Sequence, residues 1–372
     1  RAGNIDLLPV KQLLLQHRKR PLKIGSFSYC SNVTGLITNA DDVSILLHKH
    51  GAFACWDCAA GAPYLTLNMT PNSPDKVLAY KDAIMCSPHK MLGGPGTPGV
   101  LIVKKKLFIN KIPYPPNVGG GTVLFVTENE QIYLDDIQER EEGGTPDVIG
   151  SIRAGLAFRL KEEVGSSLIS NIENSHWCKV ANSLKTNSNI MMLGYSTKYE
   201  KLQRHVGIFS FLIKVQDSFL HHNFVCALFN DLYGIQTRSG CMCAGPYVVR
   251  LLHLKHDDAK KIENYIMDNP DISGLYKPGF VRLNFPYFYS DEKCEFILQA
   301  IHDIANYGWR LLPQYRFTKN GEYIHRSRFD KGSGKIVTRN NNASLWNGLQ
   351  LINNTYLNET KHIQPAKNDK EE

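Results

Sequence analysis

The sequence predicts an α/β protein in which a mainly parallel, helix-covered sheet is followed by a smaller α+β domain. Three observations support this fold class. Apolar strands alternate with amphipathic helices up to about residue 165, polar residues with catalytic chemistry stand where those strands end, and later strands and helices come in blocks. Such alternation is typical of a parallel sheet with helices on its faces. We expect a ligand to bind outside the carboxyl ends of the strands.

The first part of the chain contains three predicted helices. The amphipathic pattern over residues 5–20 predicts a helix that is broken or kinked around Pro9. Residues 41–50 predict a second helix, capped by Asp41 or Asp42. A third helix is predicted over residues 149–164. The predicted strands of this part are residues 22–29, 52–56, 81–86 and 99–103.

The later part predicts a smaller domain of mixed strands and helices. Its predicted strands are residues 189–193 and 207–215, with a further pair that flanks Arg238. Its clearest helices are residues 222–232 and 291–307, the latter capped by Ser290 or Asp291. We expect a large domain over residues 1–165, a small domain over 166–310 and a basic extension over 311–372.

Composition narrows the classes of protein. The chain has 372 residues, 42% hydrophobic and 21% charged, as in globular proteins, and no apolar stretch approaches the ~20 residues of a membrane span. Nine cysteines without regular spacing predict reduced thiols and an intracellular, cytoplasmic location. The pair Cys55 and Cys58 has no partner pair at zinc spacing, so we expect no metal.

The basic extension allows two interpretations. Residues 310–345 hold eight basic and two acidic residues, a net charge of +6, with aromatic residues among them. A nucleic-acid surface would have this composition. An appendage whose aromatic residues pack on the protein body is the interpretation we favour. Residues 358–372 are almost without apolar residues, and we expect them to be disordered.

The stretch DAIMCSPHKMLGGPGTPGVLIV at 82–103 carries the strongest chemical signal. An apolar strand leads into Ser87, His89 and Lys90, and a glycine-rich turn and a second apolar strand follow. A strand-end lysine can form a Schiff base with an aldehyde cofactor, while the hydroxyl and the imidazole can hold a phosphate. A glycine-rich turn between strands would account for this stretch alone equally well.

Asp57 supports the cofactor interpretation. It ends an apolar strand upstream of Lys90, within AFACWDCAAGAPY at 52–64. A carboxylate in this place can pair with the protonated ring nitrogen of pyridoxal phosphate and keep the ring electron-accepting. A turn residue or a helix cap is the alternative for Asp57.

These motifs carry a resemblance to a known family. DCAA at 57–60 and SPHK at 87–90 resemble the D-x-A-[QA] and S-x-H-K motifs of class V pyridoxal-phosphate enzymes, the group of cysteine desulfurases and selenocysteine lyases. Further matches follow in order along about residues 1–310: SNVTG at 31–35, EGGTP at 142–146, RSGCMC at 238–243 and VRLN at 281–284.

The resemblance implies a fold and a set of roles. The fold would be type I, with a mainly parallel seven-stranded-type sheet that is incomplete at its N-terminus. Roughly the first third of the family's large domain precedes the position where this chain begins. For the cofactor, the resemblance implies Lys90 as Schiff-base lysine and proton carrier, Asp57 for the pyridine nitrogen, Ser87 and His89 for the phosphate, and Asn32 for the phenolic oxygen. Thr145 would bind the phosphate of the other subunit of a homodimer. Arg282 with Arg238 would bind the substrate carboxylate, and Cys243 would be the sulfur-accepting thiol.

The implied function is a pyridoxal-phosphate lyase or transferase that acts on a small amino acid, most simply a cysteine desulfurase that passes sulfur to an acceptor protein. Cys241 could be the nucleophile instead of Cys243, or both could be small residues of a tight loop. Two further alternatives remain: an aminotransferase or epimerase of the same fold without a sulfur role, and a non-catalytic relative or fragment.

Overall fold

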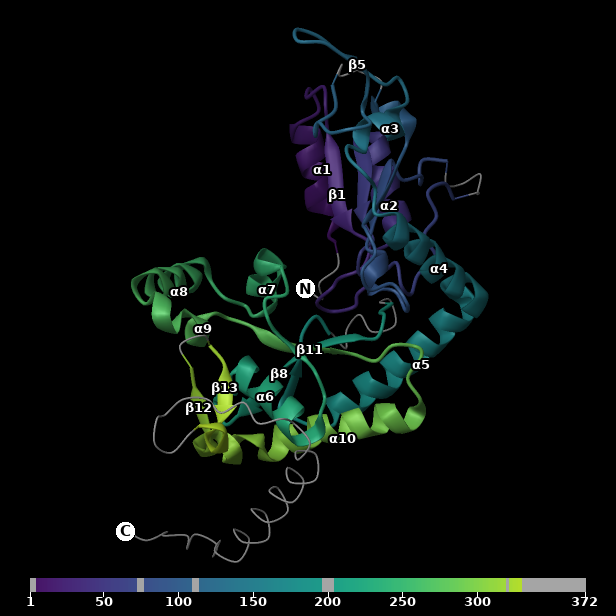
Figure 1. Cartoon of the computed structure of the whole chain (residues 1–372). Helices are drawn as coiled ribbons and strands as arrows, with labels where there is room; N and C mark the ends of the chain where they lie inside the picture. Colours follow the sequence, from purple (N-terminus) through teal and green to yellow (C-terminus); the bar gives the residue numbers. More distant parts are fainter. Residues whose placement is uncertain (1–4, 72–76, 109–113, 196–203, 319–320, 330–372) are drawn as a thin grey trace, which may run out of the picture. The chain divides into compact units, whose positions relative to one another are not determined.

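The computed structural model describes residues 5–71, 77–108, 114–195, 204–318 and 321–329 (Figure 1). The chain divides into two compact units, Arg1–Asn174 with Ser196–Val206, and Ser175–Tyr195 with Gly207–Glu372. Each unit has its own hydrophobic core. The division falls within one long helix, α5 (Ser166–Lys185).

The first unit holds most of the predicted strand-helix alternation. Its elements before α5 are α1 (Leu7–Gln16), β1 (Ile24–Ser28), α2 (Ala40–Lys49), β2 (Phe53–Asp57), β3 (Ala83–Cys86), the 3-10 turn η2 (Pro88–Lys90), β4 (Val100–Val103), the 3-10 turn η3 (Lys105–Phe108), β5 (Val123–Val126), β6 (Gln131–Tyr133), α3 (Ile137–Glu141) and α4 (Val148–Val164).

Four of these strands form the sheet that positions the predicted site. In the described residues its order is β1-β2-β3-β4, with β1, β2 and β3 parallel and β4 antiparallel to β3. Ser28 lies opposite Asp57, and Asp57 lies opposite Met85, so the three parallel strands end at one edge. The buried residues Trp56 and Ile84 centre the core between this sheet and the helices α1 and α2. The mainly parallel sheet predicted from the sequence is confirmed.

Two expectations about the first helices are wrong. α1 runs through Pro9 without a break, because Pro9 lies in the first helical turn, where its missing N–H has no partner to lose. α2 is capped by Asn39, whose Oδ1 accepts a hydrogen bond from the N–H of Asp42 at 3.4 Å. Asp41 and Asp42 instead occupy the first turn, where negative charge favours the helix.

The second unit is the α+β part. Its elements after α5 are β7 (Ile190–Met192), β8 (Ile208–Val215), β9 (Ser218–Phe219), α6 (His222–Tyr233), β10 (Arg238–Gly240), α7 (Gly245–Leu251), α8 (His256–Asp268), the 3-10 turn η5 (Pro270–Ile272), α9 (Ser273–Tyr276), β11 (Phe280–Asn284), α10 (Asp291–Tyr307), the 3-10 turn η6 (Gly308–Gln314), β12 (Tyr315–Phe317), β13 (Tyr323–His325) and the 3-10 turn η7 (Arg326–Arg328).

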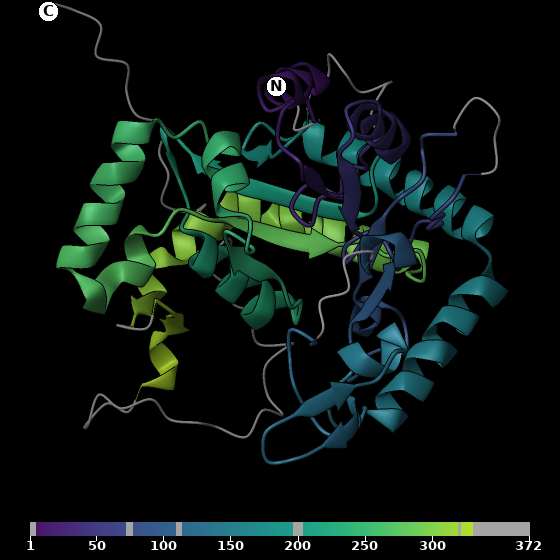
Figure 2. The same cartoon turned by 90° about the horizontal axis from the view of Figure 1, so that it is seen from above.

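An antiparallel sheet forms the centre of this unit. In the described residues the strand order is β10-β11-β8-β7, with β9 paired to β8. Phe209, Phe211 and Ile213 alternate along β8 and pack in one core with residues of α5, α6 and α10. Figure 2 shows α10 running beneath β11. α10 begins at Asp291 and is capped by Ser290, as predicted.

The start of the basic extension packs on this core. The Tyr315 ring is buried and contacts the Phe224 ring edge-on, with 5.3 Å between the ring centroids. The Tyr323 ring also lies 5.3 Å from the Phe224 ring. The Tyr315 hydroxyl donates to Asp231 at 3.0 Å, and Arg328 pairs with the same carboxylate. The packed-appendage interpretation is therefore confirmed for residues 315–318 and 321–328. The tail 358–372 lies outside the described residues.

Two searches of the described residues gave no candidate. None of the described helices has both the length and the apolar character needed to cross a membrane. Within the same residues, no group of three or more His, Cys, Asp or Glu side chains is arranged to hold a metal ion.

Candidate functional site

Five of the predicted cofactor residues lie at the carboxyl edge of β1, β2 and β3. They come from the three segments that follow or end these strands: Asn32 after β1, Asp57 at the end of β2, and Ser87, His89 and Lys90 after β3. Backbone hydrogen bonds continue across the strand ends, from Tyr29 N–H to Asp57 O and from Cys58 N–H to Met85 O, both 2.8 Å. The first unit therefore brings these five residues to one place.

Lys90 ends a tight turn directly after β3. The turn is closed by hydrogen bonds from Lys90 N–H to Ser87 O at 3.0 Å and from Met91 N–H to Pro88 O at 2.8 Å. The backbone is anchored by buried Pro88, while the side chains of His89 and Lys90 are exposed. The amine and the imidazole are thus held on a fixed turn and are accessible to a ligand.

The glycines after Lys90 have a steric reason. A Cβ at Gly94 would lie 1.9 Å from the carbonyl oxygen of Pro88, so only glycine allows the chain to fold back against the lysine turn. Gly96 has φ +85°, and a Cβ there would lie 2.8 Å from Nη1 of Arg153 on α4. The glycine-rich run is needed for this packing, whatever ligand the edge binds.

Asp57 is exposed at the end of β2. Its Oδ1 accepts a hydrogen bond from Ala59 N–H at 2.9 Å, which is the turn role that the sequence left open. A carboxylate has about four acceptor positions, so this bond is compatible with a second, ligand-binding role.

The three buried cysteine thiols near this edge of the sheet are unreactive. Cys30, Cys58 and Cys86 are buried where the three strands end. Burial raises the pKa of Cys58 to about 12 and also raises the pKa values of Cys30 and Cys86. Because thiols react as thiolates, these cysteines are packing residues.

Asn32 sits in a compact turn after β1. The Ser31 hydroxyl accepts hydrogen bonds from the N–H groups of Val33 at 3.2 Å and Thr34 at 3.1 Å. Gly35 closes the turn with φ +69°. Asn32 is half-buried at the tip of this turn.

Thr145 does not come from the three strand-end segments that hold these five residues. It belongs to the loop between α3 and α4, and its side chain is exposed. α4 then begins behind Asp147, whose carboxylate accepts from Gly150 N–H at 2.8 Å.

The second unit places the two predicted substrate arginines side by side. Arg238 on β10 lies directly opposite Arg282 on β11 in the antiparallel register. Both line a cavity of about 320 Å³ within this unit. The other lining residues are Ile235, Gln236, Thr237, Leu283, Asn284, Tyr289 and Ile297. Two adjacent guanidinium groups with amide and hydroxyl neighbours suit a carboxylate.

The two loop cysteines differ in their surroundings. Cys243 is exposed and has φ +59°, directly after Met242 with φ +56°. Cys241 is half-buried, and its Sγ lies 3.7 Å from the carbonyl oxygen of Pro278. Of the two thiols, Cys243 is the more accessible.

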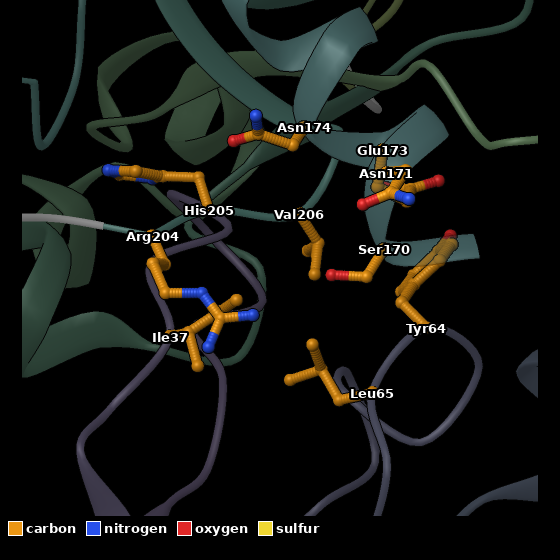
Figure 3. A pocket seen from close by; sticks show the side chains of 10 residues that line it. All are labelled: Ile37, Tyr64, Leu65, Ser170, Asn171, Glu173, Asn174, Arg204, His205 and Val206. Carbon is orange, nitrogen blue, oxygen red and sulfur yellow. The ribbon is translucent and has the colours of Figure 1, made fainter. Parts of the chain in front are cut away.

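A cavity of about 270 Å³ in the first unit was not predicted from the sequence (Figure 3). Figure 3 shows Arg204 and Ser170 reaching into it from opposite sides. The remaining lining residues are Ile37, Tyr64, Leu65, Asn171, Glu173, Asn174, His205 and Val206. These residues come from segments far apart in the sequence, so no local pattern could have indicated the cavity. Neither cavity is lined by Asp57 or Lys90.

Residues 2–258 match the family model described as aminotransferase class-V. The chain belongs to the class-V aminotransferase family. A probable cysteine desulfurase of Pyrococcus abyssi is 27% identical over 249 residues, covering 67% of this chain and 56% of that protein. A probable cysteine desulfurase of Chlamydia muridarum is 31% identical over 156 residues, covering 42% of this chain and 35% of that protein. The chain thus spans about half the length, or less, of these curated relatives.

Solved structures agree with this family. The apo structure of a cysteine desulfurase from Thermococcus onnurineus matches with 25% identity and a TM-score of 0.62, covering 82% of this chain and 64% of that one. The cysteine desulfurase CsdA of Escherichia coli, at 20% identity, has a TM-score of 0.59 with the same coverage, which shows the fold alone. The chain has the type I fold of pyridoxal-phosphate enzymes, as predicted.

Class-V aminotransferases are pyridoxal-phosphate-dependent enzymes. The residues at the sheet edge fit this cofactor. An exposed carboxylate, Asp57, suits the ring nitrogen, an exposed amine, Lys90, suits the aldehyde carbon, and Ser87 and His89 offer hydrogen-bond donors to a phosphate.

Proposed function

We propose that this chain belongs to a pyridoxal-phosphate enzyme that removes sulfur from a small amino acid, as a cysteine desulfurase does. The observation that carries the proposal is the register of the parallel strands, which brings Asp57 and the Ser87–Lys90 turn to one edge. Its relatives' names support the same chemistry. Because the chain spans only part of those relatives, the activity is assigned to the protein that contains this chain.

The chain's residues divide the work at the sheet edge. When bound, the cofactor supplies an electron sink for a carbanion at the substrate's α-carbon. Asp57 holds the ring nitrogen in its protonated form. Asn32 donates to the phenolic oxygen, and Ser87 and His89 hold the phosphate. Lys90 would hold the aldehyde carbon of the cofactor, and its amine would carry the proton at the substrate's α-carbon.

Substrate recognition is assigned to the second unit. The substrate carboxylate binds to Arg282, which holds both oxygens in the geometry that a guanidinium provides, and Arg238 lies opposite. The Cys243 thiolate would attack the sulfur atom of a cysteine substrate, so that an S–S bond forms while the Cβ–S bond breaks and its electron pair passes to the carbon skeleton. The skeleton would then take up a proton and leave as alanine, and the outer sulfur of the persulfide would pass to a thiolate of an acceptor protein. The exposure of Cys243 and the contact of Cys241 with Pro278 support this choice between the two thiols.

The functional form is proposed to be a homodimer. α4 carries an exposed apolar stripe along one side, and the loop with Thr145 directly precedes this helix. The stripe consists of Val148, Ile149, Ile152, Leu156 and Leu160. An exposed apolar stripe of this kind typically marks a surface for association with another protein. In such a dimer, Thr145 is proposed to bind the phosphate of the second copy, as the resemblance to the family implies. The free state of all nine cysteines supports a reducing, cytoplasmic location.

Chemical trapping tests the cofactor role. We expect borohydride reduction of the chain incubated with pyridoxal phosphate to label Lys90, which peptide mapping locates. Label on another lysine, or on none, would refute the assignment. Lys81 is a suitable internal control, because it is buried and paired with Asp41 at 2.6 Å.

Two single variants test the reaction. Sulfide release from cysteine should be lost in Cys243→Ala and retained in Cys241→Ala. If both variants keep the activity, the thiol mechanism is wrong. If no form releases sulfide but amino groups pass to a keto acid, the protein is an aminotransferase of this fold instead.

A further inference from the structure

α4 contacts two segments next to predicted cofactor residues, the one that follows Asp57 and the one that follows Lys90. Gly150, Ala154 and Ala157 are its buried residues, and their small side chains let the helix approach the first unit closely. Arg153 and Lys161 lie on α4 beside these small residues, about two helical turns from each other. Neither residue belongs to a motif that the sequence singled out.

Arg153 holds the segment that follows Lys90. Its Nη1 donates to the carbonyl oxygen of Pro95 at 2.9 Å. The adjacent Gly96 has no room for a side chain, because a Cβ would lie 2.8 Å from the same nitrogen. Gly94 in turn packs against the carbonyl oxygen of Pro88 in the lysine turn. The guanidinium therefore braces the lysine turn through the glycine-rich run.

Lys161 holds the segment that follows Asp57. Residues 58–65 coil into helical turns, with hydrogen bonds from Ala62 N–H to Cys58 O at 2.7 Å and from Leu65 N–H to Gly61 O at 2.8 Å. The Lys161 Nζ donates to the carbonyl oxygens of Ala62 at 2.7 Å and Leu65 at 2.5 Å. These are the carbonyls that a helical turn leaves without partners at its end, and a lysine satisfies them well.

The Lys161 amine also lies near the end of β3. Burial lowers the pKa of Lys161, and the nearby Cys86 thiol, at the end of β3, opposes that effect. A half-buried lysine whose amine donates to two backbone carbonyls has a fixed position. The same helix is thus tied to the segments after β2 and after β3.

We propose that Arg153 and Lys161 are positioning residues that hold the Lys90 turn and the Asp57 loop in register for the cofactor. The inference rests on the proposed function, in which these two segments bind pyridoxal phosphate. Neither side chain touches the cofactor; each acts through the backbone of the loop that it binds.

Hydrogen exchange of the full chain without cofactor tests the local part. We expect Lys161→Met to speed exchange of the amides in residues 61–65, and Arg153→Met to speed exchange in residues 94–97, while the strands keep their protection. The matched control is Arg159→Met on the same helix, because within the described part of the chain Arg159 forms an ion pair with exposed Glu163 at 2.9 Å and contacts neither loop. Unchanged exchange in both loops would overturn the proposal.

Equilibrium binding of pyridoxal phosphate, followed by its visible absorbance, tests the functional part. We expect each variant to bind about tenfold more weakly than the wild type, with a melting temperature equal to that of Arg159→Met. Lys161→Arg and Arg153→Lys, which keep a donor, should recover most of the affinity. Affinity within twofold of the wild type, or a loss that follows a fall in melting temperature with faster exchange throughout the unit, would overturn the proposal.

The two proposals can fail separately. If the wild-type chain binds no pyridoxal phosphate, the proposed function fails for this chain. The exchange experiment then still decides whether Arg153 and Lys161 order the loops, since it needs no cofactor.

Discussion

Two aspartates at opposite ends of the same sheet have opposite environments. Asp82, just before β3, is fully buried and is contacted by His48 Nε2 at 2.8 Å, Lys106 Nζ at 2.6 Å and Ala54 N–H at 2.8 Å. Asp57, at the end of β2, is exposed and accepts one backbone hydrogen bond. The buried carboxylate belongs to the fold, whereas the exposed one is available to a ligand. The same residue type therefore has a structural role at one end of the sheet and, in the proposed function, a cofactor-binding role at the other.

The largest expected effect is on stability at the buried end. Asp82→Asn removes the charge that faces Lys106 and His48 and leaves both donors without their anion. Removing one partner of a fully buried ion pair typically costs about 3–5 kcal/mol, and the 36% exposure of the Lys106 side chain places this case at the lower end of that range. We expect a loss of this size in the free energy of unfolding of the first unit, measured by urea-dependent hydrogen exchange in β2 and β3. A loss below about 1 kcal/mol would show that the network contributes little.

The converse is expected at the exposed end. Asp57→Asn keeps the turn acceptor, so the unfolding free energy should change by no more than about 0.5 kcal/mol. Loss of the charge at the cofactor ring should lower turnover on the order of a hundredfold. Steady-state kinetics of the loaded enzyme measures this effect. Unchanged turnover would remove Asp57 from the proposed mechanism, while a large loss of stability would break the contrast with Asp82.

The pH dependence of stability sharpens the same contrast. Burial alone would raise the pKa of Asp82, but the hydrogen bonds from His48, Lys106 and Ala54 together hold it below the ordinary value of 3.8. The unfolded chain therefore takes up this proton first as the pH falls, and Asp82 stabilises the fold fully only above about pH 4. We expect the first unit to lose stability as the pH falls below that value. In urea titrations at several pH values, Asp82→Asn should show a flatter acid limb than the wild type. Equal slopes would contradict the assignment.

The smallest effect is expected at an ion pair in open solvent. Arg159 and Glu163 on α4 are 2.9 Å apart, with 74% and 60% of their side chains exposed. Exposed pairs at this spacing contribute about 0.3–0.5 kcal/mol. Arg159→Met should change the unfolding free energy by no more than this, measured by the same exchange experiment. A larger change would mean that the pair has a role beyond the surface.

The exposed end of the sheet was predictable from the sequence, and the buried end was not. Asp57 and Lys90 stand directly at the ends of apolar strands, so local patterns place them at one edge. Asp82 meets His48 and Lys106 only because the strands pair as they do, and the contacting residues are 34 and 24 positions apart. Hydrophobic periodicity in the sequence does not predict contacts between residues so far apart.

The antiparallel direction of β4 was also not predicted from the sequence. β4 lies antiparallel to β3, and only residues 87–99 connect them, with no α-helix among them. A parallel return needs a longer crossover, usually through a helix. This direction brings Lys104 and Lys106 back to the end of the sheet where Asp82 lies. Arg153 and Lys161 were missed for a related reason, since their partners are backbone carbonyls that carry no sequence signal.

The left-handed backbone of Met242 and Cys243 has a consequence for protein engineering. Side chains other than glycine lose about 1–2 kcal/mol in this conformation, and here two consecutive residues adopt it. Glycine at position 243 would remove that cost. Selection for thermal stability alone would therefore favour replacement of Cys243 by glycine. A library screened first for heat resistance and then for sulfur transfer should separate into two populations at this codon. Under the proposed function, the stability of this loop and sulfur transfer by Cys243 therefore favour different residues at position 243.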